Sequence, residues 1–137
     1  MDAESLLQHA REVFGADNYA ALTGVEIISA GGHEAVCTLT LDRRHSNARG
    51  VTMGGVLFTM ADFAAAVAAN TDAEVELNWV SLNGNIHYLA PAKEGVTLTA
   101  HSQPLKIGRA TALYQTEIKS LDDGKAVAIV ETTMMHV

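Results

Sequence analysis

Residues 54–69 read GGVLFTMADFAAAVAA, and Asp62 is the single charged residue in this apolar run. An ionised carboxylate among apolar side chains is costly to bury unless it is paired or hydrogen-bonded. Burial and neighbouring groups can also shift the pKa of such an acid towards a chemical task. Asp62 is therefore a candidate catalytic acid or base, and the alternative is a structural carboxylate bonded to backbone or hydroxyl groups.

Gly54 and Gly55 open the same run, which predicts a buried helix over residues 54–69. The first N–H groups of a helix lack intrahelical partners and carry a partial positive charge. Glycine has no side chain, so a ligand can approach this backbone closely. The pair suits an oxyanion site for acyl transfer, although two glycines can also serve only to pack a helix tightly on a sheet.

Asp62 follows Gly54 by eight residues, which is ~12 Å along a helix axis. A substrate held at Gly54 cannot reach Asp62 of the same chain by simple adjacency. Either a partner subunit brings a second helix start close to Asp62, or a binding groove runs along the helix.

The net charge of −7 argues against a nucleic-acid partner. Three of the nine Lys and Arg residues nevertheless lie close together, at Arg43, Arg44 and Arg49, beside His45. This cluster either receives an anionic ligand or forms a solvated loop.

Cys37 is the only cysteine, so no internal disulfide can form and a cytoplasmic location is expected. The histidines show no close ligand spacing, and we expect no metal site. The apolar run is too short to cross a membrane, and the N-terminus does not resemble a secretory signal.

The remaining pattern predicts a helix over residues 3–14 that stops at Gly15, and strands over 23–30 and 34–42 with a turn at Gly31-Gly32. Alternation over 79–88 predicts a strand that places Ser81 and Tyr88 on opposite faces. Further strands are expected over 96–101, 109–120 and 125–136, the last two joined through Asp122-Asp123-Gly124. Pro91 and Pro104 are expected at strand ends.

These elements predict an α+β fold in one domain over residues 1–137. An antiparallel sheet wraps around one long apolar helix, and a short helix lies at the N-terminus. Because one sheet around one helix leaves a face to cover, a homo-oligomer is expected.

The motif N-x2-G-x3-GG-V-L-F-T-M-A-D, from Asn47 to Asp62, resembles the hotdog-fold acyl-CoA thioesterases of the phenylacetate-pathway (PaaI-like) group. The segment from Val80 through Pro91-Ala92 and the strands up to Val137 also resemble that group. The likeness covers roughly residues 20–137 and is most specific over 47–62. It implies a hotdog fold in dimers or tetramers, with active sites at the dimer interface.

The resemblance also implies roles for individual residues. Asp62 aligns with the catalytic general base or nucleophile, and Asn47 with the residue that orients the water or the substrate carbonyl. Gly54 aligns with the backbone donor to the thioester oxygen. Ser81 aligns with a hydroxyl that some members contribute from the neighbouring subunit.

On the substrate side, Met53 and Gly55 flank the oxyanion donor, and Lys106, Gly108 and Arg109 fall where relatives contact coenzyme A. The family usually reads HGG where this chain reads Met53-Gly54-Gly55. A backbone donor survives that change, whereas any role of the imidazole is lost.

The resemblance favours hydrolysis of an acyl-CoA thioester, with coenzyme A as part of the substrate and no separate cofactor. A hotdog hydratase would pair an acid with a catalytic histidine, but no histidine lies between His45 and His87. A non-catalytic acyl-CoA binding module would fit Met53, but it would not need both Asn47 and Asp62.

Overall fold

The computed structural model describes residues 1–137, which form three α-helices, a 3₁₀ turn and six strands. Along the chain these are α1 (Ala3–Phe14), α2 (Asn18–Thr23), β1 (Glu26–Gly31), β2 (Glu34–Thr40), the 3₁₀ turn Arg43–His45, α3 (Gly54–Ala69), β3 (Trp79–Tyr88), β4 (Thr97–Ile107), β5 (Thr111–Ser120) and β6 (Ala126–His136). None of the helices is both long and apolar enough to cross a membrane.

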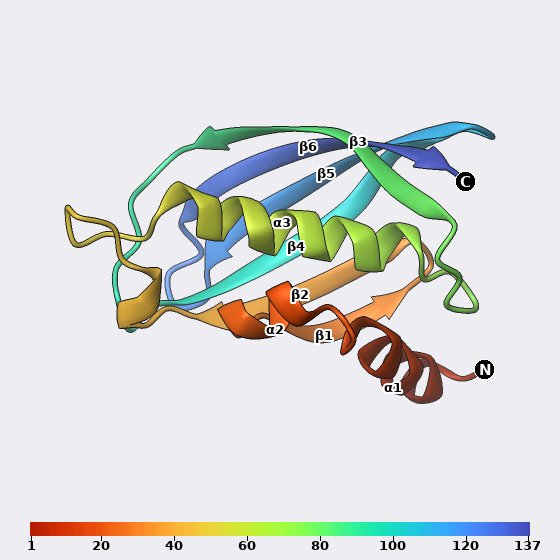
Figure 1. Cartoon of the computed structure of the whole chain (residues 1–137), viewed down its shortest axis with the longest axis horizontal. Helices are drawn as coiled ribbons and strands as arrows, with labels where there is room; N and C mark the ends of the chain where they lie inside the picture. The colour runs from red at the N-terminus through yellow and green to blue at the C-terminus, as the bar shows by residue number, and fades with distance from the viewer.

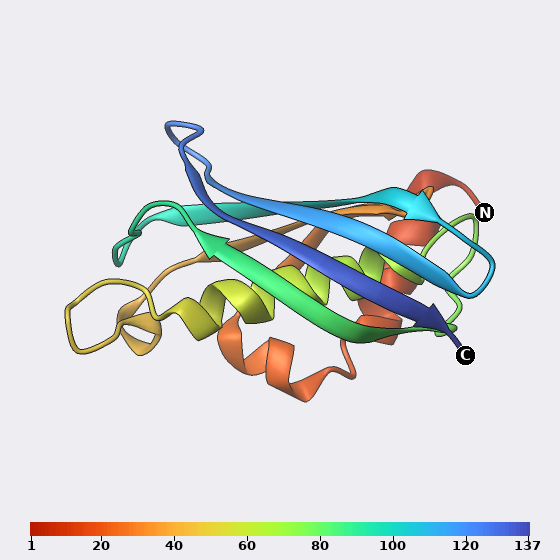
Figure 2. The same cartoon turned by 90° about the horizontal axis from the view of Figure 1, so that it is seen from above.

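The strands form one antiparallel sheet in the order β1-β2-β4-β5-β6-β3, so β1 and β3 are its edges. Helix α3 lies across one face of this sheet, and α1 and α2 cover the side near β1 (Figures 1 and 2). The structure thus confirms the predicted hotdog arrangement of an antiparallel sheet and one central helix.

The composition of α3 explains its central position. Nine of its sixteen residues are buried, and five of these are alanines. Alanine is the strongest helix former, and its small side chain lets the helix lie close to the sheet. The strands contribute larger buried side chains to the core, among them Leu39, Leu98, Ile118 and Met134.

Helix α2 was absent from the sequence expectation, which began a strand at residue 23. The Asp17 side chain caps α2 by accepting a hydrogen bond from the Ala20 N–H, and Gly24 ends it in the left-handed conformation at φ 87°. Six residues are too few to show a helical apolar period, so the strand begins later, at Glu26.

A β-bulge in β3 overturns one prediction. The pairing of β3 with β6 skips Leu82, because Ser81 pairs with Met134 and Asn83 with the next residue, Thr133. An inserted residue reverses the alternation beyond it. The prediction that Ser81 and Tyr88 lie on opposite faces is therefore wrong, because both pair with buried residues of β6, Met134 and Ala128.

Strand β4 is longer than predicted and contains Pro104, which was expected at a strand end. The register between β4 and β5 shifts between Pro104 and Lys106. A bulge is one of the few places where a strand interior accepts a proline, because the regular hydrogen-bond ladder is interrupted there.

Candidate active site

One stripe of α3 lies against the edge strand β3, and we call this the α3–β3 contact. The pairs along it are Gly54 with Tyr88, Phe58 with Gly84, Asp62 with Ser81, and Asn70 with Trp79. The helix residues recur at multiples of four, which places them on one face. The two residues expected to carry chemistry, Gly54 and Asp62, therefore both face β3.

Ser81 Oγ donates a 3.2 Å hydrogen bond to Asp62 Oδ1. The prediction that Asp62 is buried is wrong for the single chain, because this residue is exposed to solvent. Protein atoms around its carboxyl nevertheless displace enough water to raise the pKa, which the Ser81 hydrogen bond lowers and the Asp17 charge raises further. A carboxylate with a raised pKa is a better proton acceptor than an ordinary one.

The start of α3 presents two free backbone donors. Met53 occupies the N-cap and makes no side-chain hydrogen bond to the helix. The first N–H that bonds back is that of Val56, which donates to the Met53 carbonyl at 3.0 Å. The N–H groups of Gly54 and Gly55 find no acceptor in the chain, as an oxyanion site requires.

The space around Gly54 and Gly55 differs. A Cβ on Gly54 would lie 2.6 Å from Tyr88 Oη, so no larger residue fits without moving the tyrosine. A Cβ on Gly55 would meet nothing within 4 Å, so the surface beside Gly55 is open to a ligand.

Asn47 lies in the loop before α3, and its side chain stabilises the turn of this loop. Its side-chain oxygen accepts hydrogen bonds from the N–H groups of Arg49 at 2.9 Å and Val51 at 3.3 Å. No hydrogen bond joins Asn47 to Asp62 of the same chain. The side-chain amide nitrogen of Asn47 is therefore the group that remains to meet a ligand.

Some residues of the basic cluster form hydrogen bonds within the chain, and others are exposed without an ion pair. The Arg44 guanidinium bonds to Asp42 and to the Leu22 carbonyl, and buried His45 bonds to the Thr23 carbonyl. Arg43 and Arg49 remain exposed and make no ion pair, so these two can face an anion.

Lys106, Gly108 and Arg109 lie at the β4–β5 turn, at the opposite end of the sheet from the start of α3 (Figures 1 and 2). Ala110 of this turn accepts a hydrogen bond from the N–H of His136, whose ring stacks edge-on against Trp79. Within one chain, the structure thus separates the basic cluster, a candidate anion site, from the residues expected to contact coenzyme A.

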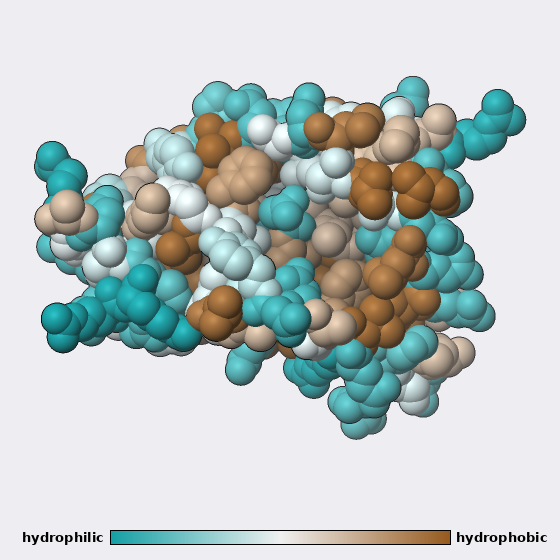
Figure 3. Space-filling model, viewed as in Figure 1, coloured by the Kyte–Doolittle hydropathy of each residue, from teal (hydrophilic) through white to brown (hydrophobic).

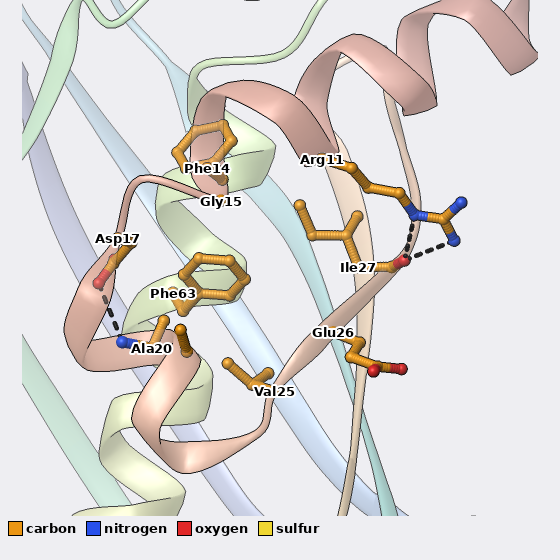
Figure 4. A pocket seen from close by; sticks show the side chains of 10 residues that line it. Arg11, Phe14, Gly15, Asp17, Ala20, Val25, Glu26, Ile27 and Phe63 are labelled. Carbon is orange, nitrogen blue, oxygen red and sulfur yellow. Dashed lines mark hydrogen bonds between the residues drawn. The ribbon is translucent and has the colours of Figure 1, made fainter.

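Two hollows flank α3. One of about 410 Å³ lies beside Gly54 and Leu57 and is closed by Tyr88 and the loop Leu89–Ala92. The other, of about 400 Å³, lies between α1, α2 and β1, where Phe14 and Phe63 meet edge-on at 6.0 Å (Figure 4). No grouping of three His, Cys, Asp or Glu side chains converges anywhere in the chain to hold a metal.

Sequence reasoning did not place Tyr88 beside Gly54. Regular alternation placed it on the face away from Ser81, and no residue type in β3 marks the bulge that reverses this assignment. The only available hint was Gly84, where a Cβ would lie 2.7 Å from the Phe58 ring of α3.

Comparison with known proteins identifies the family. Residues 49–127 match the family model described as the thioesterase superfamily. The chain is 35% identical to acyl-coenzyme A thioesterase PaaI of Escherichia coli, over 81% of this chain and 77% of that protein. It is 30% identical to human acyl-coenzyme A thioesterase 13, over 90% of this chain and 91% of that protein.

Solved structures agree. The E. coli PaaI protein superposes with a TM-score of 0.87 at 30% identity, over 98% of this chain and 95% of that one. A hypothetical thioesterase from Streptococcus pneumoniae, solved with coenzyme A, superposes with a TM-score of 0.81 at 25% identity, over 93% and 96% of the two chains. The chain therefore belongs to the thioesterase superfamily, as a hotdog-fold thioester hydrolase of the PaaI-like group.

Proposed function

We propose that this protein hydrolyses acyl-CoA thioesters to a free acid and coenzyme A. The observation that carries the proposal is the α3–β3 contact, which combines a hydrogen-bonded carboxylate of raised pKa at Asp62 with free N–H groups at Gly54 and Gly55. The names of the E. coli and human relatives and the coenzyme A in the S. pneumoniae structure support the choice of substrate.

In the general-base route, Asp62 accepts a proton from water while the water oxygen attacks the thioester carbon. The carbonyl electron pair moves to the oxygen, where the Gly54 N–H stabilises the negative charge. The C–S bond then breaks, and the departing thiolate takes the proton from Asp62. Asn47 orients the water or the carbonyl through its free amide nitrogen.

In the nucleophile route, an Asp62 oxygen attacks the thioester carbon and expels the thiolate, leaving a mixed anhydride that water then hydrolyses. A single turnover in ¹⁸O-labelled water distinguishes the routes. The nucleophile route allows the label to enter the Asp62 carboxyl, whereas the general-base route places it only in the released acid.

The proposal includes a second copy of the chain. Gly54 and Asp62 are separated by ~12 Å of helix, so the active site pairs Asp62 of one subunit with Gly54 of another. Edge strand β3 offers the surface for this association, because Val80 and Leu82 in the strand and Leu89 directly after it are exposed. Apolar groups are interspersed with polar ones over the face that carries α3 (Figure 3).

A shared site also brings together residues that one chain separates. Arg43 and Arg49 precede α3 in the chain, whereas Lys106, Gly108 and Arg109 lie at the end of β4 and in the β4–β5 turn, at the far end of the sheet (Figure 1). In an oligomer, the β4–β5 turn of one subunit can lie beside the α3 start of another, and both can contact coenzyme A phosphates. The proposed partners of this protein are the acyl-CoA substrate and a second copy of the chain. Cys37, a free thiol with no disulfide partner, suits the cytoplasm.

The first experiment is thiol release from a panel of acyl-CoA substrates, followed by absorbance of a thiol reagent. Turnover of at least one acyl-CoA by the wild-type protein supports the proposal. Binding of acyl-CoA in calorimetry without any turnover would favour the alternative, a non-catalytic binding module, for which exposed Met53 in place of the family histidine is the specific observation.

Mixing two inactive variants tests the shared site. Asp62→Asn and Gly54→Ala each damage a different half of it, the second through collision with Tyr88. In a mixed dimer one site carries both changes and the other carries neither, so activity should return on mixing. Folding of each variant is checked by its melting temperature, and two folded variants that stay inactive together would place the site within one chain.

A further inference from the structure

We propose that Tyr88 is a catalytic residue whose hydroxyl donates a hydrogen bond to the thioester oxygen, beside the N–H groups at the start of α3. This inference rests on the proposed function and adds a side-chain donor to an oxyanion site otherwise made of backbone. A tyrosine hydroxyl is one of the groups that can supply such a donor.

The position of the tyrosine supports this role. A Cβ on Gly54 would lie 2.6 Å from Tyr88 Oη and 2.7 Å from Cζ. Because a carbon–carbon bond is about 1.5 Å long, the hydroxyl oxygen lies within about 4 Å of the Gly54 Cα. The hydroxyl is thus held next to the backbone that carries the first free N–H of the helix.

The hydroxyl is also available. It makes no hydrogen bond to another residue, unlike Ser81 and Asn70 in the same α3–β3 contact. The side chain is 56% exposed and borders the hollow of about 410 Å³ beside Gly54. Gly54 borders the same hollow, so a ligand that enters it lies beside both residues.

The β-bulge at Leu82 makes the arrangement possible. By reversing the alternation of β3, it turns both Ser81 and Tyr88 towards α3. One strand therefore supplies a hydroxyl to two shared sites, Ser81 to the carboxylate of one and Tyr88 to the oxyanion donor of the other. Without the bulge, one of the two hydroxyls would point away from the helix.

The test is Tyr88→Phe in the active wild-type background, with Tyr19→Phe as the matched control. Tyr19 lies on α2 and is 66% exposed, so its variant loses a hydroxyl outside the α3–β3 contact. Loss of one oxyanion donor lowers kcat by about 10²–10³-fold. We expect this loss for Tyr88→Phe, with KM and melting temperature close to wild type, and none for Tyr19→Phe.

A second measurement separates donation from packing. Fluorotyrosine incorporated at position 88 keeps the ring and strengthens the hydroxyl as a donor, so kcat in mildly acidic buffer should equal or exceed that of the wild type. An unchanged kcat in Tyr88→Phe would overturn the role of Tyr88 alone. A lower kcat accompanied by a higher KM and a lower melting temperature would do the same. Failure of the wild type to turn over any acyl-CoA would overturn the proposed function together with it.

Discussion

The Ser81 hydroxyl donates a 3.2 Å hydrogen bond to Asp62 Oδ1 and so joins the edge of the sheet to the middle of the central helix. One carboxylate oxygen is fixed by this bond, and the other is left to face a water or a substrate. The same bond stabilises the ionised form of Asp62 and lowers a pKa that desolvation raises.

Ser81→Ala is expected to move the acidic limb of the pH profile. Removal of the donor raises the pKa of Asp62 further, so the carboxylate becomes protonated at a higher pH and kcat/KM begins to fall at a higher pH as the solution is acidified. Initial rates across a pH series measure the shift. Ser29→Ala in β1 is the control, and an unshifted limb in Ser81→Ala would show that Ser81 does not affect the group that governs this limb.

Asp62→Asn is expected to lower kcat by about 10²–10⁴-fold, the range for a lost general base, with a much smaller change in KM. Larger losses would suit the nucleophile route. A variant with near-wild-type kcat would remove Asp62 from the mechanism, and steady-state kinetics on the best acyl-CoA decides the point.

The same variant should be at least as stable as the wild type at neutral pH. The pKa of Asp62 is raised above its ordinary value of 3.8, so the ionised carboxylate destabilises the fold at neutral pH. The wild type recovers this free energy as pH falls through the raised pKa, and the advantage of Asp62→Asn should shrink in that window. Thermal melts at neutral and acidic pH measure it, and a marked loss of stability at neutral pH would favour a structural role for Asp62.

Met53→His is expected to change the rate or the acyl preference while the fold remains intact. The Met53 side chain is 59% exposed at the N-cap of α3 and makes no capping hydrogen bond, so the helix does not depend on it. A histidine there restores the family pattern and adds a group that can transfer a proton. Identical kinetics across an acyl-CoA panel would show that this departure from the family has no functional effect.

Arg109→Ala is expected to raise KM for acyl-CoA with little change in kcat, the behaviour of uniform binding. The effect should shrink with added salt, because exposed charge contacts are screened. Lys125→Ala, which removes an exposed cation from the β5–β6 turn, is the matched control. If KM rises equally for a thioester that lacks the nucleotide end, Arg109 is structural.

The central part of the fold could be predicted because its signals are local. The run over residues 54–69 is apolar on nearly every side, which only a buried helix explains, and the observed α3 has these bounds. The turn at Asp122-Asp123-Gly124 likewise marked the hairpin of β5 and β6. The spacing from Asn47 to Asp62 was sufficient to indicate the family.

The missed features depend on tertiary structure. Leu82 is bulged because the pairing of β3 with β6 skips it, and nothing in its own residue type indicates this. The exposure of Asp62 depends on how far β3 covers α3. The distance between the β4–β5 turn and the start of α3 depends on the direction of β4 (Figure 2). Sequence spacing describes neighbours on one element and carries little information about distances between elements.

Gly84 sets the thickness of the layer between β3 and α3. A Cβ at this position would lie 2.7 Å from the Phe58 ring, so only a hydrogen atom separates strand and ring there. Gly84 lies between Ser81 and Tyr88 along β3, and any larger side chain would have to displace the Phe58 ring or the strand itself. The packing of β3 on α3 between Asp62 and Gly54, which are far apart along the helix, thus depends on the small size of a single residue that contacts neither.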